Sequence, residues 1–171
     1  VRHNDVQAFA DALSEWRMSG QAGTPWIIVE SLYSMDGDQA PLAALAELAE
    51  QHRAMLVIDE AHATGVFGAQ GRGLAAALDG RANVITLRTF GKALGCEGAI
   101  LCGPKIMRDF IVNRGRGFIF STAPSPLMAA IARSALSIMA KADDRREDLW
   151  QRVALAQARL AGLGIAATGS Q

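Results

Sequence analysis

One lysine in this sequence, Lys92, lies in surroundings that favour chemistry at its side-chain amine over a solvated surface charge. It is flanked by the small residues Gly91, Ala93 and Gly95, and it closely follows an apolar run that ends at Leu87. These small neighbours leave open space, which suits a bulky group bonded to the amine or resting on it. Lysine amines in proteins form Schiff bases with carbonyl compounds, so this stretch predicts covalent chemistry at Lys92.

Three further residues at the ends of predicted strands could act with such a lysine. Asp59 ends the apolar run that begins at Ala54, and a carboxylate buried there could keep a pyridine nitrogen protonated. His62 follows three residues later and could hydrogen-bond or stack on an aromatic ring. Thr89, three residues before Lys92, offers a hydroxyl and nearby backbone N–H groups to a phosphate. Together these residue types predict a Schiff base between Lys92 and pyridoxal phosphate (PLP).

Each candidate also has a structural interpretation. Asp59 could be a solvated acid at a strand end, and a lone histidine such as His62 is more often structural. Glu30 and Ser34, at the end of a neighbouring predicted strand, could reach the ring or the lysine, or they could be turn and capping residues. Thr122 and the serine before it could bind phosphate or could cap the next helix. The residue types alone leave these alternatives open.

Strand and helix patterns alternate along the chain. The apolar runs at 26–30, 54–59 and 83–87 are typical of strands buried on both faces of a parallel sheet. A fourth strand at 98–102 is expected to be antiparallel because only a short turn precedes it, and 118–120 is predicted as a further short strand. Helices are predicted after Asp5 and Pro41, from 104 to about 113, from 125 to 140 and from 143 to 161, with the charged run 143–148 forming a solvated face. This order predicts an α/β fold, a mostly parallel sheet sandwiched by helices, with ligands at the carboxyl ends of the strands.

Composition restricts the class of protein. The 171 residues, 50% of them hydrophobic, fit one domain of ordinary size. A formal net charge of 0 gives no reason to expect nucleic acid or an anionic membrane as partner, and no apolar run approaches the ~20 residues of a membrane span. The spacing of Cys96 and Cys102 fits neither a disulfide framework nor a metal site and is typical of the reducing cytoplasm. Because the chain begins at Val1 and stops soon after a helix-stop signal, we expect it to be the middle of a longer protein.

The letters of Asp59-Glu60-Ala61-His62 also resemble motif II of DEAH-type helicases, in which the Asp and Glu serve magnesium and water. This alternative, a nucleic-acid-dependent ATPase, needs a phosphate-binding lysine loop and a basic surface, and the sequence contains neither. A metal site at the same residues lacks a further ligand cluster. A third alternative is a non-catalytic chain that only dimerises.

Four ordered motifs resemble the α-oxoamine synthases, PLP enzymes of fold type I that condense an amino acid with an acyl-CoA and release CO2. The resemblance runs from about Trp26 to about Ala140, and the motifs are Ser34-Met35-Asp36-Gly37-Asp38, the segment 59–68, Gly71-Arg72-Gly73 and the segment 89–95. It is strongest to the members that act in biotin synthesis, which implies L-alanine and pimeloyl-CoA as substrates. Glycine with acetyl- or succinyl-CoA, or serine with a long-chain acyl-CoA, remains the alternative.

The resemblance also implies a role for each matched residue. Lys92 carries PLP and acts as acid and base at the substrate α-carbon. Asp59 pairs with the pyridinium nitrogen, His62 hydrogen-bonds the phenolic oxygen, and Ser34 contacts the same side of the ring. Glu30 is carried over as a neighbour of the ring.

The same resemblance implies that the site is shared between subunits. Thr89 binds the phosphate of its own subunit's cofactor, and Thr122 reaches the phosphate of the other cofactor in a homodimer. Residues 1–140 would then be part of the PLP-binding large domain, and residues 141–171 a linker helix that leads toward a C-terminal small domain. Other binding residues of the family lie outside the matched motifs, so we expect the 171 residues alone to be inactive.

Overall fold

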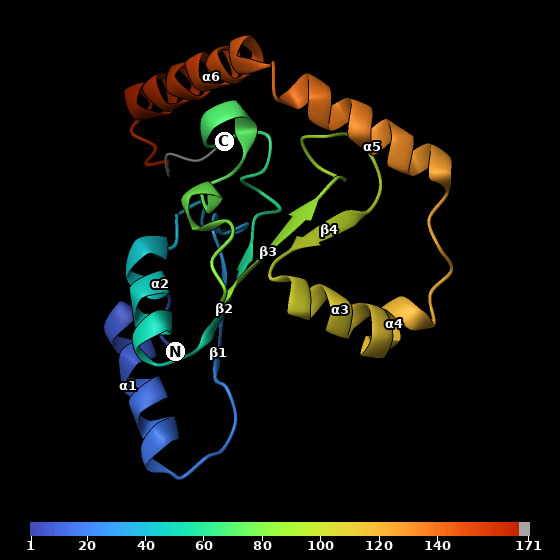
Figure 1. The fold of residues 1–171 in the computed structure, drawn as a ribbon. Helices are drawn as coiled ribbons and strands as arrows, with labels where there is room; N and C mark the ends of the chain where they lie inside the picture. The colour runs from blue at the N-terminus through green and yellow to red at the C-terminus, as the bar shows by residue number, and fades with distance from the viewer. Residues whose placement is uncertain (168–171) are drawn as a thin grey trace.

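A computed structural model describes residues 1–167 of the chain, which fold around a four-stranded sheet (Figure 1). The strands follow one another in the order of the sequence, and they are β1 Trp26–Glu30, β2 Met55–Asp59, β3 Val84–Thr89 and β4 Ala99–Cys102. The first three are parallel, and β4 is antiparallel to β3. The predicted α/β fold with a mostly parallel sheet is therefore confirmed.

The helices also follow the predicted order, and they are α1 Val6–Met18, α2 Leu42–Gln51, α3 Lys105–Arg114, α4 Arg116–Ile119, α5 Pro126–Met139 and α6 Asp143–Gly162. Two single 3₁₀ turns, η1 Ala69–Gly71 and η2 Ala76–Leu78, lie between β2 and β3. The Asp5 side chain caps α1 by accepting the Ala8 N–H at 3.0 Å, as predicted. Ser125 caps α5 by accepting the Leu127 N–H. Within residues 1–167, no helix is both long and apolar enough to cross a membrane.

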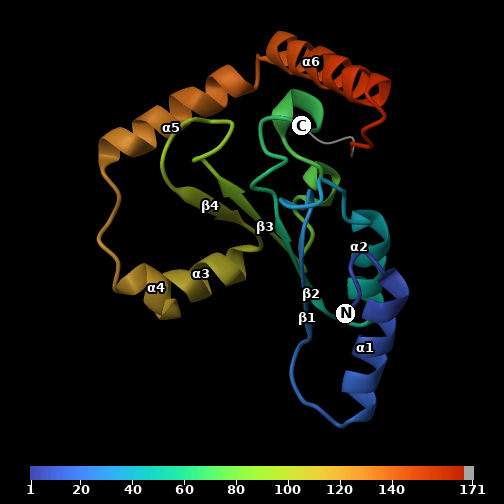
Figure 2. The ribbon, with the colours of Figure 1, turned by 180° about the vertical axis from the view of Figure 1, so that it is seen from behind.

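One face of the sheet forms the hydrophobic core. Ile58 of β2 and Val84 of β3 pack there with side chains of α1 and α2. On the opposite face, a cavity lies between α3 and the strands β3 and β4, and Figures 1 and 2 place α3 and α4 at the β4 end of the sheet. Trp26 and Ile28 on β1 are 49% and 68% exposed. The prediction that the strands are buried on both faces is therefore wrong for β1, because α3 and α4 do not extend over it.

The predicted strand at 118–120 is also wrong. These residues belong to α4 and its end, where the Ile119 N–H donates to the Gly115 carbonyl at 2.9 Å and the Phe120 N–H donates to the Arg116 carbonyl at 3.0 Å. Three apolar residues without a neighbouring strand cannot form a ladder, whereas a helical turn satisfies the backbone locally. The charged run at the start of α6 is solvated except for Arg146, which is buried.

Candidate functional site

The carboxyl ends of three strands bring most of the predicted site residues to one edge of the sheet. Glu30 lies opposite Asp59 in the pairing of β1 with β2, and Asp59 lies opposite Leu87 in the pairing of β2 with β3. Thr89 ends β3 two residues beyond Leu87, and the loop that follows carries Lys92. Strand register thus gathers residues that are distant in the sequence.

Lys92 and His62 are in direct contact. The Lys92 Nζ atom lies 2.6 Å from His62 Nε2, and the lysine is exposed while the histidine is half-buried. The Lys92 loop is closed by its own backbone, because the Gly95 N–H donates to the Lys92 carbonyl at 3.0 Å and the Cys96 N–H donates to the Phe90 carbonyl at 2.8 Å. At this separation the two nitrogens are within hydrogen-bonding distance, so the histidine can orient the amine.

The side chain of Asp59 is fixed by a hydrogen bond from the backbone. Its Oδ1 atom accepts the Ala61 N–H at 2.8 Å, and the residue is half-buried, so the carboxylate is fixed and still reachable. Glu30 accepts the backbone N–H of Ser34 at 3.0 Å, which favours the turn-capping interpretation of Glu30. Ser34 itself is exposed at the same edge of the sheet.

The two threonines lie in different surroundings. The Thr89 hydroxyl accepts the Gly91 N–H at 3.3 Å and donates to the Gly98 carbonyl at 3.4 Å, within the loop that carries Lys92. Both bonds are long and could be exchanged for bonds to a ligand. Thr122 is exposed in the segment between α4 and α5, and it does not lie at the end of a strand that contributes to this edge. The chain therefore gathers the predicted residues except Thr122.

A buried acid that the sequence analysis did not assign to the site lies directly after Asp59. Glu60 is 0% exposed, and its Oε1 atom accepts the Ala75 N–H at 3.0 Å. Its Oε2 atom lies 3.5 Å from the Arg88 guanidinium. A Cβ atom built on Gly73 would lie 1.5 Å from the same Oε2 atom, so the carboxylate occupies the space that a side chain at position 73 would need.

Arg88 extends this ion pair into a network. Its Nη2 atom lies 3.0 Å from Asp79 Oδ1, and its Nη1 atom donates to the Arg72 carbonyl. The pair of Glu60 and Arg88 therefore joins three motifs: the turn after β2, the glycine-rich loop and the strand that leads to Lys92. An arginine at the end of an otherwise apolar strand was the sequence signal for this network, because such a residue needs a partner.

Burial raises the pKa of the Glu60 carboxyl, and the nearby Ser31 hydroxyl, the hydrogen bond from the Ala75 N–H and the charge of Arg88 oppose this rise. The folded protein then binds this proton more tightly than the unfolded chain does. We expect the free energy of unfolding to fall as the pH rises from near 4.5, the ordinary value, through the raised pKa. The loss is about 1.4 kcal/mol for each unit by which the pKa is raised.

Glu60→Gln should remove this pH dependence. Urea unfolding of the whole protein and of this variant, followed between about pH 4 and pH 8, would measure the difference in unfolding free energy. We expect the wild type to lose stability relative to the variant as the pH rises. A difference that stays constant across the range would contradict the assignment.

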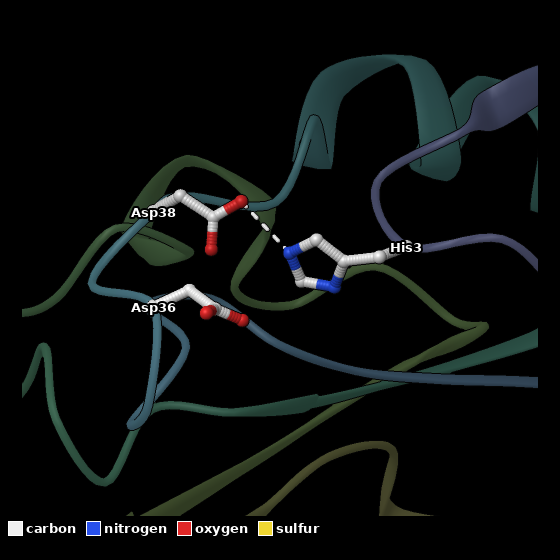
Figure 3. Close-up of side chains that lie close together, drawn as sticks. All are labelled: His3, Asp36 and Asp38. Carbon is white, nitrogen blue, oxygen red and sulfur yellow. Dashed lines mark hydrogen bonds and ion pairs between the residues drawn. The ribbon is translucent and has the colours of Figure 1, made fainter.

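A second cluster lies near the N-terminus, where the side chains of His3, Asp36 and Asp38 face one another (Figure 3). Their possible ligand atoms lie within 4.8 Å of one another. The Asp38 Oδ2 atom already lies 2.8 Å from His3 Nε2 and accepts the Asn4 side-chain amide at 2.6 Å. We therefore interpret the cluster as a structural one, whose hydrogen bonds hold the N-terminal segment against the turn after Ser34.

The whole chain is similar to a known protein family. The family model described as "Aminotransferase class I and II" matches residues 1–171. The chain belongs to the aminotransferase class I and II family. The family match and the complete burial of Glu60 leave the ATPase alternative without support, because a buried acid that is paired with Arg88 cannot meet a metal-bound water.

Curated proteins similar to this aminotransferase-family chain include two named 8-amino-7-oxononanoate synthase. The one from Anaeromyxobacter sp. (strain K) is 44% identical over 165 residues, which are 96% of this chain and 40% of that protein. The one from Chromobacterium violaceum is 43% identical over 175 residues, which are 99% of this chain and 44% of that protein. The chain thus spans less than half the length of these relatives.

Solved structures of the same fold include a serine palmitoyltransferase from S. paucimobilis with a bound PLP–myriocin adduct. It superposes with a TM-score of 0.84 at 27% sequence identity, over 99% of this aminotransferase-family chain and 44% of that one. An 8-amino-7-oxononanoate synthase from Francisella tularensis superposes with a TM-score of 0.74 at 24% identity, over 94% of this chain and 45% of that one. Both likenesses agree with the fold of type I PLP-dependent enzymes, of which the matched residues cover less than half.

Proposed function

We propose that the protein is an α-oxoamine synthase that holds PLP on Lys92 and joins an amino acid to an acyl-CoA, with release of CoA and CO2. The observation that carries the proposal is the 2.6 Å contact between Lys92 Nζ and His62 Nε2, at the strand edge where Asp59 ends β2. The names of the curated relatives and the PLP bound to a similar structure support it. Because the chain spans less than half of those relatives, the proposal concerns the whole protein.

The side chains at this edge fit PLP chemically. The exposed Lys92 amine can bond to its aldehyde carbon, and the half-buried Asp59 carboxylate can accept a hydrogen bond from a ring N–H. The Thr89 hydroxyl and the Gly91 N–H, joined to each other by a bond of 3.3 Å, are donors suited to a phosphate. When bound, PLP supplies an electron sink for negative charge at the substrate α-carbon.

Side chains of this protein would carry out the proton transfer and hold the reacting groups in position. We propose that Lys92 removes and returns the proton at the substrate α-carbon, with His62 holding the amine in position. Asp59 keeps the proton on the ring nitrogen because a nearby carboxylate favours the charged form of that ring. Ser34 and Glu30 border the same edge, where Glu30 Oε2 accepts the Ser34 backbone N–H at 3.0 Å and so fixes the turn after β1.

For the substrates we propose L-alanine and pimeloyl-CoA, as in biotin synthesis, because the curated relatives carry the name of that enzyme. Glycine with acetyl- or succinyl-CoA is the first alternative. Serine with a long-chain acyl-CoA is the second, and the likeness to serine palmitoyltransferase favours it. We propose the cytoplasm as the compartment, in line with the free thiols of Cys96 and Cys102.

We further propose a homodimer with a shared site, in which the exposed Thr122 reaches the phosphate of the other subunit's cofactor. Residues 1–140 are proposed as part of the PLP-binding large domain. Residues 141–171 are proposed as the linker helix that leads to a small domain, and α6 makes up most of this stretch. The last part of it, 168–171, lies outside the described residues.

The test is a substrate panel on the whole protein, with CoA release as the readout. We expect alanine with pimeloyl-CoA to exceed each other pair in kcat/KM by about 10-fold or more, because even one methylene in an apolar pocket changes this ratio about 10- to 200-fold. The 171-residue chain, assayed in parallel, is expected to release no CoA. Absence of CoA release from every pair in the whole protein would overturn the proposal, and a preference for serine with palmitoyl-CoA would favour the second alternative.

A further inference from the structure

Arg146 is a buried cation in a run of exposed charges. The side chain is 10% exposed, whereas that of Arg152, six residues later on the same helix, is 74% exposed. Burial of a guanidinium is costly unless its donors are satisfied, so a buried arginine indicates a specific set of partners.

The partners of Arg146 come from three segments. Its Nη1 atom donates to the Met139 carbonyl at 2.9 Å, where α5 ends, and to the Gly65 carbonyl at 3.3 Å, in the turn after β2. Its Nε and Nη2 atoms donate to Asp143 Oδ1 at 3.2 and 2.6 Å, at the start of α6. A Cβ atom built on Gly71 would lie 2.8 Å from Nη1, so the guanidinium fills the space beside the glycine-rich loop.

The turn that Arg146 holds lies directly behind the reactive lysine. A Cβ atom built on Gly65 would lie 2.6 Å from the Ala93 Cβ, and Ala93 is the residue after Lys92. His62 belongs to the same turn as Gly65, three residues earlier. The backbones that carry the two members of the Lys92–His62 pair therefore touch where Arg146 is bound.

A second contact joins α6 to the same segment. The rings of Phe67 and Trp150 meet edge to face, with centroids 5.0 Å apart, and both views of the fold place α6 over the segment between β2 and β3 (Figures 1 and 2). A cavity of about 260 Å³, lined in part by Arg146, lies between Leu94 of the Lys92 loop and Ile138 of α5. The loop has room to shift if Arg146 no longer holds the turn.

We propose that Arg146 is a positioning residue that sets the distance between His62 and Lys92. It does so by hydrogen bonding both to the end of α5 and to the turn that carries His62. The inference rests on the proposed function of Lys92. The planar fork of the guanidinium can bind the carbonyls of Gly65 and Met139 together with Asp143, whereas an ammonium at this position is a single point charge.

The test compares Arg146→Met and Arg146→Lys in the whole protein, with Arg152→Met as the control. Arg152 lies on the same helix and forms an exposed ion pair with Asp148, so its loss removes a charge without a buried contact. In cofactor-free protein, the rate of acetylation of Lys92 by acetic anhydride is measured by peptide mass spectrometry, relative to that of Lys105. In the PLP-loaded protein, kcat and KM are measured.

We expect Arg146→Met to raise the ratio of Lys92 to Lys105 acetylation about threefold or more, because the amine loses its ordered partner. We also expect kcat to fall about 10- to 100-fold with little change in KM, since a misplacement of 1 Å costs about 10²-fold. Arg146→Lys should recover part of both effects, and Arg152→Met should behave as the wild type. If Arg146→Met matches Arg152→Met in both readouts and only melts earlier, the inference is wrong.

A second variant covers the case in which Arg146→Met does not fold. Asp143→Asn removes the carboxylate that anchors Nε and Nη2 but lies at an exposed position, with the Asp143 side chain 76% exposed. It should move both readouts in the same direction by a smaller factor, and an unchanged acetylation ratio would overturn the inference. Failure of the proposed function is separate, because PLP would then not be bonded to Lys92 in the wild type either.

Discussion

Replacing Lys92 with alanine is expected to abolish turnover of the whole protein and to remove the PLP that borohydride fixes to the chain. The lysine is proposed both to bond the cofactor and to carry the proton at the substrate α-carbon, so no neighbouring group can replace it. Loss of a positioned acid–base group alone costs about 10²- to 10⁴-fold, so kcat should fall at least about 10³-fold. CoA release and peptide mass spectrometry after borohydride treatment would measure both effects.

Two control variants make this result specific. Lys105→Ala removes another lysine, whose side chain is 77% exposed and pairs with Asp109, and it should leave both readouts unchanged. Asp59→Asn should keep PLP fixed to Lys92 but lose most of the turnover, because the ring nitrogen loses its carboxylate partner. A fixed cofactor that persists in Lys92→Ala would show that another residue holds it.

Gly73→Ala is expected to destabilise the protein by about 3 kcal/mol or more beyond the cost of Gly80→Ala. Both glycines have a positive φ, +92° and +86°, so both variants carry the backbone strain of about 1 to 2 kcal/mol that a side chain meets there. A Cβ atom at position 80 meets nothing within 4 Å, whereas one at position 73 lies 1.5 Å from Glu60 Oε2. The larger cost reflects displacement of a buried carboxylate from Arg88, for which losses of about 3 to 5 kcal/mol are typical.

Urea unfolding of the two variants would measure this difference. Adding Gly73→Ala to a Glu60→Ala background supplies a further control, because the clash with the carboxylate is then absent and the remaining close atom, Arg88 Nη1 at 3.2 Å, is the end of a flexible side chain. We expect Gly73→Ala to cost no more in that background than Gly80→Ala does in the wild type. Equal costs for both glycine variants in the wild type would mean that the turn shifts freely and that Glu60 does not hold it.

The elements of the fold could be read from the sequence because each has a local cause. Apolar runs that end in Glu30 and Asp59 predicted β1 and β2, and the short connection before Ala99 predicted the antiparallel direction of β4. The contact between His62 and Lys92 was also within reach, because both follow parallel strands and therefore meet at one edge of the sheet.

Other features depend on contacts that no local pattern contains. The exposure of Ile28 depends on where α3 lies, and the helical turn at Phe118 depends on the absence of a strand partner. The burial of Glu60 and Arg146 requires knowledge of which loops approach them, because their sequence neighbours are ordinary charged or turn residues. Long-range ion pairs and carbonyl contacts of this kind become visible only in three dimensions.

The direction of β4 decides which later parts of the chain can return to the site. Because β4 runs opposite to β3, it carries the chain from the lysine loop back to the far end of the sheet, where α3 and α4 lie (Figure 1). The exposed segment at 120–125 then leads back, and α5 and α6 follow along the site edge. Because of this one strand reversal, the chain passes the same edge twice, first with Lys92 and later with Arg146.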